Sequence, residues 1–296
     1  MKKTGFIAIV GRPNVGKSTL LNAILGEKVA IVSAKPQTTR NRITGIHTDG
    51  ENQFVFLDTP GIHAPKNALG EYMVKTANAT MLDADVIVFV ADAGREAGQL
   101  DLSIVESIKS SHIPAILVLN KTDTVNAEEI GARLTEYSAL HEFEAYVPIS
   151  ARRGEGVSAV LDECAAFLHE EEWFFPDDIV TDQPERQMAA EIIREKLLRT
   201  LNKEIPHGIA VVIEDFKEED TLIRISANIY CEKESHKGII VGKRGAELKM
   251  VGTYAREDME KLFGTKVYLN LWVKVKANWR ENEQIVGNFG YRKDEE

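Results

Sequence analysis

One short stretch constrains the fold of this chain more than any other: a glycine-rich turn between an apolar strand and a helix. Residues 11–19 (GRPNVGKST) fit the pattern G-x-x-x-x-G-K-[ST] at every fixed position. Residues 6–10 (FIAIV) predict a buried strand before it, and residues 18–25 (STLLNAIL) predict a helix after it. Such a turn directs backbone N–H groups and a helix N-terminus at one spot, which binds phosphate. An ordinary glycine turn entering a helix is the alternative, and both flanks argue against it.

The fixed positions of this phosphate loop have defined chemical roles. Lys17 would reach the β- and γ-phosphates of a nucleotide, and the Ser18 hydroxyl would be a ligand of Mg²⁺. The nucleotide contacts predicted within the loop are Asn14, Val15, Gly16, Lys17, Ser18 and Thr19.

A second motif, Asn-Lys-x-Asp, follows another apolar strand pattern and indicates the base. The Asp123 carboxylate can accept two hydrogen bonds from guanine, whereas adenine lacks that pair of donors and would leave the carboxylate unpaired. Asn120 would contact the base and tie loops together, and the stem of Lys121 would lie along the ring. After the next apolar strand pattern come Ser150 and Ala151, and the Ala151 N–H is placed to meet the guanine carbonyl.

A third motif, Asp-x-x-Gly, spans residues 58–61 (DTPG) and follows the apolar run 54–57 (FVFL). This pattern would place Asp58 near the Mg²⁺ shell and the N–H of Gly61 near the γ-phosphate. A strand that leads into a Pro-Gly turn is the alternative interpretation.

The order and spacing of these motifs resemble the translation-factor-like class of GTPases. Residues 36–40 (PQTTR), between the first and third motifs, resemble switch I of its tRNA-modification and ribosome-assembly branch. The resemblance implies that one threonine hydroxyl binds Mg²⁺ when the γ-phosphate is present, with Thr39 preferred and Thr38 as the alternative. The Mg²⁺ ligands are therefore expected to be Ser18, Thr39 and Asp58.

The residue after DTPG departs from the Ras-like pattern. Ras-like enzymes place a glutamine there that orients the attacking water, whereas Ile62 cannot hydrogen-bond water. In related GTPases with asparagine at the position of Asn14, that side chain helps to hold a K⁺ ion in place of an arginine finger. The alternative is that Asn14 only tolerates a left-handed backbone. The expected catalytic set is Asn14, Lys17, Thr39 and Gly61.

Length and composition fit a globular protein of two domains, with 296 residues, 44% of them hydrophobic and 28% charged. No apolar run approaches 18 residues, and the chain starts directly in a strand pattern, so neither a membrane span nor a signal segment is expected. The two cysteines have no metal-ligand spacing, which is typical of a reducing cytosol.

Apolar strand patterns alternate with helical stretches through the first part of the chain, which predicts a doubly wound α/β sheet with its ligand at the carboxyl ends of the strands. Residues 42–48 are a candidate edge strand. The expected divisions are a GTPase domain over 1–172, a linker over 173–183 and a second domain with a C-terminal tail over 184–296.

The second domain predicts the order α-β-β-α-α-β, with a helix over 184–202 and strands over 209–213, 221–230 and 266–275. Between its last two helices lies GKRG, a G-x-x-G loop of the kind that KH domains use to clamp about four nucleotides. The net charge of −10 argues against bulk nucleic-acid binding, but residues 237–280 carry ten basic and four acidic residues. The expected RNA contacts are Ile239, Ile240, Gly242, Lys243, Arg244, Gly245 and Lys249, with one isoleucine also serving the core.

A guanine-nucleotide domain followed by a KH domain resembles the Era family of ribosome-assembly GTPases over nearly the whole chain. The resemblance implies GTP as substrate, Mg²⁺, and single-stranded RNA near the 3′ end of small-subunit ribosomal RNA as partner. It also implies a role in assembly of the small ribosomal subunit, a nucleotide-controlled domain arrangement, and a cytoplasmic monomer with peripheral membrane contact as an option. The alternatives are a tRNA-modification GTPase, although no reactive-cysteine motif or cofactor loop is found, and an RNA-binding protein with a regulatory nucleotide site.

Overall fold

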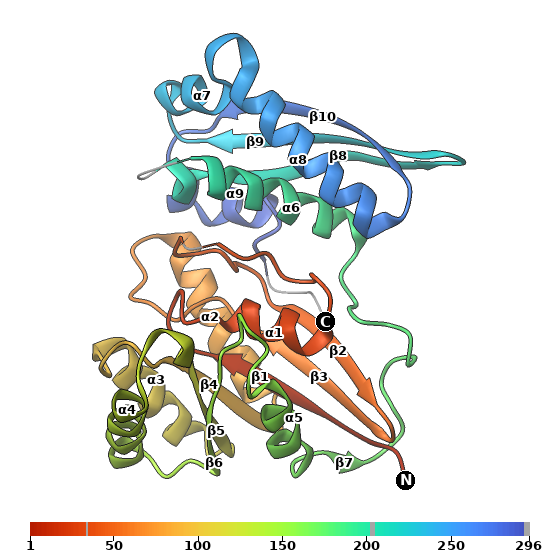
Figure 1. The fold of residues 1–296 in the computed structure, drawn as a ribbon. Helices are drawn as coiled ribbons and strands as arrows, with labels where there is room; N and C mark the ends of the chain where they lie inside the picture. Colours follow the sequence, from red (N-terminus) through yellow and green to blue (C-terminus); the bar gives the residue numbers. More distant parts are fainter. Residues whose placement is uncertain (34, 202–204, 293–296) are drawn as a thin grey trace. The chain divides into compact units, whose positions relative to one another are not determined.

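The computed structural model of the chain describes residues 1–33, 35–201 and 205–292, and the chain divides into two compact units (Figure 1). Unit 1 comprises Met1–Lys66 and Gly70–Asp182, and unit 2 comprises Asn67–Leu69 and Gln183–Glu296. Each unit has its own sheet and its own apolar core. Within the described ranges, no helix has the length and apolar character needed to cross a bilayer.

The sheet of unit 1 has the strand order β2-β3-β1-β4-β5-β6, with β7 paired to β1. Its strands are β1 (Lys3–Val10), β2 (Ile43–Asp49), β3 (Asn52–Asp58), β4 (Val86–Asp92), β5 (Ala115–Asn120), β6 (Ala145–Pro148) and β7 (His169–Glu170). Neighbouring strands are parallel except that β2 is antiparallel to β3 and β7 is antiparallel to β1. The edge strand expected over 42–48 is confirmed by β2.

Helices cover both faces of this sheet. They are α1 (Lys17–Leu25), α2 (Ala68–Leu82), α3 (Gln99–Ser111), α4 (Ala127–Leu140) and α5 (Val157–Ala165), with a 3₁₀ turn η1 (Thr122–Thr124). Because side chains alternate along a strand, β1 contributes Ile7 and Ile9 to the core shared with α1 and α5. Its other face contributes Ala8 and Val10 to the core shared with α3 and α4. The predicted doubly wound α/β fold is therefore confirmed, and it brings the carboxyl ends of β1, β3, β4 and β5 to one edge.

The segment that follows β7 packs on strands β1 and β2 of unit 1. The ring of Phe174 stacks on Phe6 with centroids 4.9 Å apart. In β2, the backbone N–H of Ile46 donates to the carbonyl of Val180 at 2.9 Å, and the Thr181 hydroxyl donates to a β2 carbonyl at 2.7 Å. The aromatic and apolar residues of the expected linker are therefore packed against the sheet.

Unit 2 has a three-stranded sheet of order β10-β9-β8, in which β10 is parallel and β8 antiparallel to β9. Its elements are α6 (Glu185–Thr200), η2 (Ile205–Gly208), β8 (Ala210–Glu219), β9 (Leu222–Cys231), α7 (Glu234–Val241), η3 (Lys243–Gly245), α8 (Ala246–Phe263), β10 (Lys266–Val275), η4 (Trp279–Glu281) and α9 (Glu283–Asn288). Residues of α6, α7 and α8 share one core with the sheet.

The predicted α-β-β-α-α-β order of unit 2 is confirmed by α6, β8, β9, α7, α8 and β10. Strand β8 is longer than expected, because a register shift between Ile213 and Asp215 lets it continue through a charged segment. The short helix α9 was not expected. Its neighbour Phe289 stacks on Tyr230 with centroids 4.4 Å apart, which ties the C-terminal segment to β9.

Candidate nucleotide site and RNA loop

The phosphate loop joins β1 to α1, and two glycines fix its shape. Gly11 has φ +154°, and a Cβ there would lie 2.5 Å from the carbonyl of Val90. Gly16 has φ +104°, and a Cβ there would lie 2.2 Å from Nδ2 of Asn120. Both positions combine a positive φ with close neighbours, so only glycine fits them without displacement.

Lys17 lies in the first turn of α1, and its side chain folds back over the loop. Its Nζ donates to the carbonyls of Gly11 at 3.0 Å and Arg12 at 3.2 Å. Burial lowers the pKa of Lys17 to about 8, and the nearby charge of Asp58 opposes that shift. The side chain therefore remains a cation near neutral pH at the place where a phosphate would bind.

The three predicted metal ligands come together at the ends of α1, β3 and the switch I segment. The Ser18 hydroxyl donates to Oδ2 of Asp58 at 2.6 Å and lies 2.9 Å from the hydroxyl of Thr39. The Thr39 hydroxyl lies 3.4 Å from the same Asp58 oxygen. In contrast, the Thr38 hydroxyl donates to the carbonyl of Lys35 at 2.6 Å, so the geometry favours Thr39.

The charge state of Asp58 shows that this corner suits a cation. Its side chain is fully buried, and among the described residues Oδ1 has no hydrogen-bond partner. Burial raises the pKa of Asp58 to about 6, although Lys17 and hydrogen bonds from Ser18 and Thr39 lower it. A carboxylate and two hydroxyls are hard oxygen ligands of the kind that Mg²⁺ prefers, so these residues fit the ion.

The turn after β3 lies directly on the phosphate loop. A Cβ at Gly61 would lie 2.8 Å from the backbone of Pro13, so a side chain there would push the two loops apart. The N–H of Ile62 donates to the carbonyl of Gly11 at 3.3 Å, and its side chain is buried in the core. The next residue, His63, has Nδ1 2.8 Å from the Gly61 carbonyl, a contact that the motif analysis did not single out.

A hollow opens beside the phosphate loop. It is bounded by this loop, by the switch I segment and by the turn after β3. Its walls are formed by Pro13, Asn14, Gly16, Lys17, Ser18, Thr19, Ile31, Val32, Ser33, Gln37, Thr38, Thr39 and Gly61. The predicted contacts of the phosphate loop therefore surround one space, except Val15, whose side chain is buried in the core.

The Asn-Lys-x-Asp motif begins at the last residue of β5 and joins three loops. The Asn120 side chain donates to the carbonyl of Val15 at 2.8 Å and accepts from the N–H of Ala151 at 3.0 Å. Lys121 has a left-handed backbone, φ +68°, and its Nζ donates to the carbonyl of Asn14 at 2.7 Å. The phosphate loop and the base loops are thus one hydrogen-bonded assembly.

Asp123 is held as a carboxylate at the same edge. The Ser150 hydroxyl donates to its Oδ1 at 2.8 Å, and this bond is the largest cause of a lowered pKa of Asp123. Arg153, which lies outside the predicted motifs, is 3.9 Å from Oδ2, and its charge lowers the pKa of Asp123 by a smaller amount. An ionised Asp123 with one oxygen fixed can accept hydrogen bonds from guanine.

In unit 2 the GKRG loop joins α7 to α8, and its backbone needs the two glycines. Gly242 has φ +72°, and a Cβ there would lie 2.5 Å from Cγ of Glu247. Gly245 has φ +80° and precedes the first residue of α8. Lys243 and Arg244 are exposed between them, as is Lys249 one turn into α8.

The structure separates the two isoleucines that were expected to form the RNA floor. Ile240 is 1% exposed and belongs to the core of unit 2, so its assignment as an RNA contact is wrong. The side chain of Ile239 is 51% exposed, because consecutive side chains on a helix point about 100° apart. Met250 and Tyr254 on α8 are also exposed, and they lie four residues apart on one helix face.

Comparisons with known proteins agree with both sites. The model of a family described as 50S ribosome-binding GTPases matches residues 6–121, and that of the KH domain matches residues 204–280. The GTPase Era of Ruminiclostridium cellulolyticum is 49% identical to this chain, with 98% of each covered. The chain belongs to the Era family of GTPases. The GTPase Era of Syntrophus aciditrophicus is 52% identical, with 98% of this chain and 96% of the relative covered.

Solved structures of Era have the same fold over the same extent. A variant of Aquifex aeolicus Era bound to GDP·AlF₄⁻ superposes with a TM-score of 0.94 at 42% identity, covering 98% of this chain and 99% of the other. An Era bound to MgGDPNP and nucleotides 1506–1542 of 16S ribosomal RNA gives a TM-score of 0.95 with the same identity and coverage. As an Era-family member, the chain is a GTPase with a KH domain.

Three acidic or basic residues outside the expected set also contact this Era-family nucleotide site. Arg12 and Asp101 form a buried ion pair beside the phosphate loop, and Asp92 pairs with Lys121. No motif spacing marks them, because each partner lies on a different element of the sheet edge. Of the three, only Arg12 lies within a predicted motif, and it occupies a variable position of the phosphate-loop pattern.

Proposed function

We propose that this GTPase binds single-stranded RNA near the 3′ end of small-subunit ribosomal RNA and acts in assembly of the small ribosomal subunit. The observation that carries the proposal is the presence, in one chain, of a guanine-nucleotide cradle and an exposed basic G-x-x-G loop. The RNA-bound relative supports it, since that Era was bound to MgGDPNP together with nucleotides 1506–1542 of 16S ribosomal RNA.

We infer that the polar residues at the edge of unit 1 bind GTP in the roles that their motifs predict. Lys17 is charged and faces the hollow, so it is suited to hold the β- and γ-phosphates. Asp123 and the N–H of Ala151 would recognise guanine, with Asn120 fixing the distance between the base loops and the phosphate loop. Asn14, Gly16 and Gly61 would shape the phosphate end.

Ser18, Thr39 and Asp58 would hold Mg²⁺. When bound, this ion neutralises charge on the phosphate oxygens. Thr39 would couple switch I to the nucleotide, because its hydroxyl lies 2.9 Å from that of Ser18. Loss of the γ-phosphate would release this segment, which is the proposed route from nucleotide state to domain arrangement.

Ile62 stands where Ras-like enzymes place the water-orienting glutamine, and its side chain is turned into the core, so it cannot orient the attacking water. K⁺ held with the help of Asn14 is the proposed substitute. Asn14 has φ +66°, which also agrees with the alternative that it only tolerates a left-handed backbone. Turnover that is faster in KCl than in NaCl supports the K⁺ proposal, and equal turnover removes it.

The RNA contacts proposed for unit 2 are the exposed face of the loop and its two helices. Lys243, Arg244 and Lys249 would meet phosphates, and Gly242 and Gly245 let the RNA backbone approach. Ile239 would lie under the bases. The monomeric state, the cytoplasmic location and the peripheral membrane contact stay predictions, and so do the domain boundaries, which are inferred from the sequence pattern around residues 157–184.

The deciding experiment is GTP hydrolysis in potassium buffer with and without the 3′-terminal single strand of small-subunit ribosomal RNA, with ATP as the control. We expect the chain to hydrolyse GTP and not ATP. This RNA should raise the rate of GTP hydrolysis, and a scrambled strand of equal length should not. Turnover that is indifferent to the RNA would contradict the coupling of the two units. GTP binding without turnover would favour the regulatory nucleotide site instead.

A further inference from the structure

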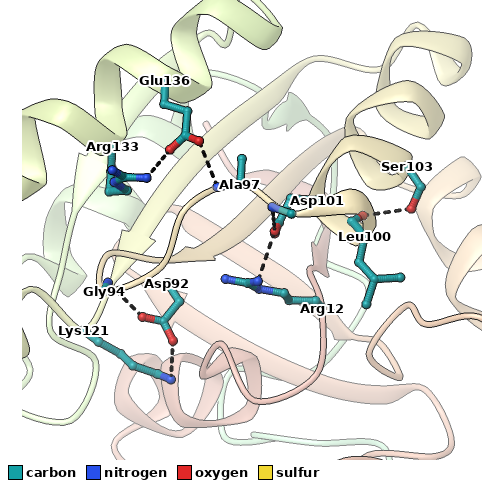
Figure 2. Close-up of polar contacts among 11 residues, drawn as sticks. Arg12, Asp92, Gly94, Ala97, Leu100, Asp101, Ser103, Lys121, Arg133 and Glu136 are labelled. Atoms are coloured by element: carbon teal, nitrogen blue, oxygen red, sulfur yellow. Dashed lines mark hydrogen bonds and ion pairs between the residues drawn. The ribbon is translucent and has the colours of Figure 1, made fainter.

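The phosphate loop is supported from the side by residues 92–101, which comprise the last residue of β4, the segment that joins β4 to α3, and the first turn of α3. Figure 2 shows two acidic side chains of this segment pointing at the nucleotide site: Asp101 meets Arg12, and Asp92 meets Lys121. The segment carries none of the nucleotide motifs. Its two carboxylates nevertheless contact residues on which the geometry of the site depends.

The Arg12–Asp101 pair is the deeper of the two. Nη1 of Arg12 lies 3.2 Å from Oδ2 of Asp101, and the side chains are 15% and 0% exposed. The same Asp101 oxygen accepts the N–H of Gly98 at 2.9 Å, so it also caps α3. On the other side, the backbone carbonyl of Arg12 accepts from Nζ of Lys17 at 3.2 Å. One residue therefore links the buried carboxylate to the phosphate-binding lysine.

The surroundings leave Arg12 few other partners. Nη2 of Arg12 is buried and has no hydrogen-bond partner among the described residues, and the hydroxyl of Tyr137 faces the Asp101 carboxylate. Tyr137 belongs to α4, and its own burial and the charge of Asp101 both raise its pKa, so it stays neutral. Removal of the Asp101 charge would leave the Arg12 cation buried without compensation.

The Lys121–Asp92 pair acts on the other end of the loop. Nζ of Lys121 lies 2.7 Å from Oδ2 of Asp92 and 2.7 Å from the carbonyl of Asn14. Oδ1 of Asp92 accepts the N–H of Gly94 at 3.0 Å, which fixes the carboxylate at the end of β4. Asp92 thus orients the lysine whose stem would lie along guanine and which also holds Asn14.

The joining segment is itself fastened to α4. The N–H of Ala97 donates to Oε1 of Glu136 at 3.1 Å, and Glu136 is paired with Arg133 (Figure 2). The segment is therefore a fixed support between α4 and the phosphate loop.

We propose that Asp92 and Asp101 are positioning residues for the nucleotide site, which hold residues 12–14 of the phosphate loop through Lys121 and Arg12. The proposal deepens the proposed function and rests on it, because the loop must bind the nucleotide phosphates for its position to matter. Asp101 fixes the loop at the Lys17 side, and Asp92 fixes it at the guanine side. Their loss speeds nucleotide release without removing any group that contacts the nucleotide.

The test is the dissociation rate of a fluorescent GDP analogue, measured by stopped flow on the full chain. Asp101→Asn keeps an acceptor for Gly98 but loses the charge, and Asp92→Asn does the same for Gly94. Each is expected to raise the dissociation rate about tenfold, the usual effect of one hydrogen bond to a charged group. The KM for GTP should rise while kcat at saturating GTP changes by less than about threefold, since no transition-state contact is removed.

Two further variants separate positioning from a merely structural role. Glu106→Gln on α3 removes an exposed carboxylate that pairs with Lys109 at 2.8 Å, and its dissociation rate should equal that of the unchanged chain. Asp92→Glu keeps the charge that Asp92→Asn removes, and it should release the nucleotide more slowly than Asp92→Asn does.

A double-mutant cycle with Arg12→Gln and Asp101→Asn gives the sharpest result. The two changes should be strongly non-additive in dissociation rate, because both remove the same ion pair. Dissociation rates of both aspartate variants within twofold of the unchanged chain would overturn the proposal, as would additive effects in the cycle. If the unchanged chain shows no saturable GDP binding, the proposed nucleotide site is itself wrong, and the positioning role is wrong with it.

Discussion

The nucleotide site and the GKRG loop differ in how their functional side chains are held. Ser18, Thr39 and Asp58 are bonded to one another at the sheet edge, and Asp58 is fully buried. Lys243 and Arg244 are exposed, and it is the glycine backbone that fixes their loop. A buried polar site rejects a ligand that leaves its groups unpaired, whereas exposed cations attract any phosphate chain. We therefore expect side chains to determine nucleotide specificity, and loop shape with base contacts to determine RNA specificity.

The largest effect at the nucleotide site is expected from Lys17→Ala. The change removes the buried cation that faces the phosphates, and we expect GTP affinity to fall at least a hundredfold, as for the loss of two charge-assisted hydrogen bonds. Isothermal titration with GTP measures the effect. Lys109→Ala, on the exposed face of α3, is the matched control and should bind normally. Retained tight binding by the Lys17 variant would contradict the assignment of the phosphate loop.

Base selection should respond to Asp123→Asn. The amide presents a donor where the carboxylate presents an acceptor. The affinity for xanthine nucleotides relative to guanine nucleotides should therefore rise by about a hundredfold. Competition between GTP and xanthosine triphosphate measures the ratio. The ratio should not change in Asp162→Asn, which alters a carboxylate of α5 outside the motif. An unchanged ratio in the Asp123 variant would show that the base is recognised elsewhere.

The dependence on pH tests whether Asp58 binds the metal. Its pKa is raised to about 6, so below that pH Asp58 is protonated and Mg²⁺ must displace a proton to bind. We expect the apparent Mg²⁺ affinity of the GTP complex to fall about tenfold per pH unit below about 6, and to be flat above it. The free energy of unfolding of the metal-free protein depends on pH in the opposite direction. Ionisation of the buried Asp58 carboxyl destabilises the fold, so the stability that its protonated form contributes is lost as pH rises toward 6. A flat Mg²⁺ affinity between pH 5 and 7 would remove Asp58 from the metal site.

The smallest effect should come from the exposed loop. Lys243→Ala removes one phosphate contact, so RNA affinity should fall only about fivefold, with the salt slope flatter by about 0.7. Fluorescence anisotropy at several salt concentrations measures both quantities. Lys261→Ala near the far end of α8 is the control. A loss of RNA affinity as large as the loss of GTP affinity in Lys17→Ala would contradict the interpretation of Lys243 as one exposed phosphate contact among several.

The sequence predicted those parts of the molecule whose determinants are local. The phosphate loop, Asp58 and Asn120 lie in contiguous patterns, and the structure confirms the strand predicted before each pattern and the helix predicted after the phosphate loop. Thr39 rather than Thr38 was a choice by resemblance, and the structure brings the Thr39 hydroxyl to Ser18.

The rest depended on partners that are distant in the chain. Asp101 contacts Arg12 across 89 positions, and no periodicity relates two residues that meet only at the edge of a folded sheet. The error at Ile240 has another cause, because the phase of a short helix against its core is set by tertiary packing rather than by its own eight residues. The extension of β8 depends on a bulge, and the charged residues of this segment do not predict one.

The packing of Val180 and Thr181 on β2 has a practical consequence. Strand β2 ends the sheet of unit 1, and an open edge of this kind recruits strands from other molecules. The backbone of Val180 and the hydroxyl of Thr181 cover part of that edge. A fragment cut after residue 172 would uncover it and should associate with itself in solution, whereas a fragment ending at residue 182 retains its own cover.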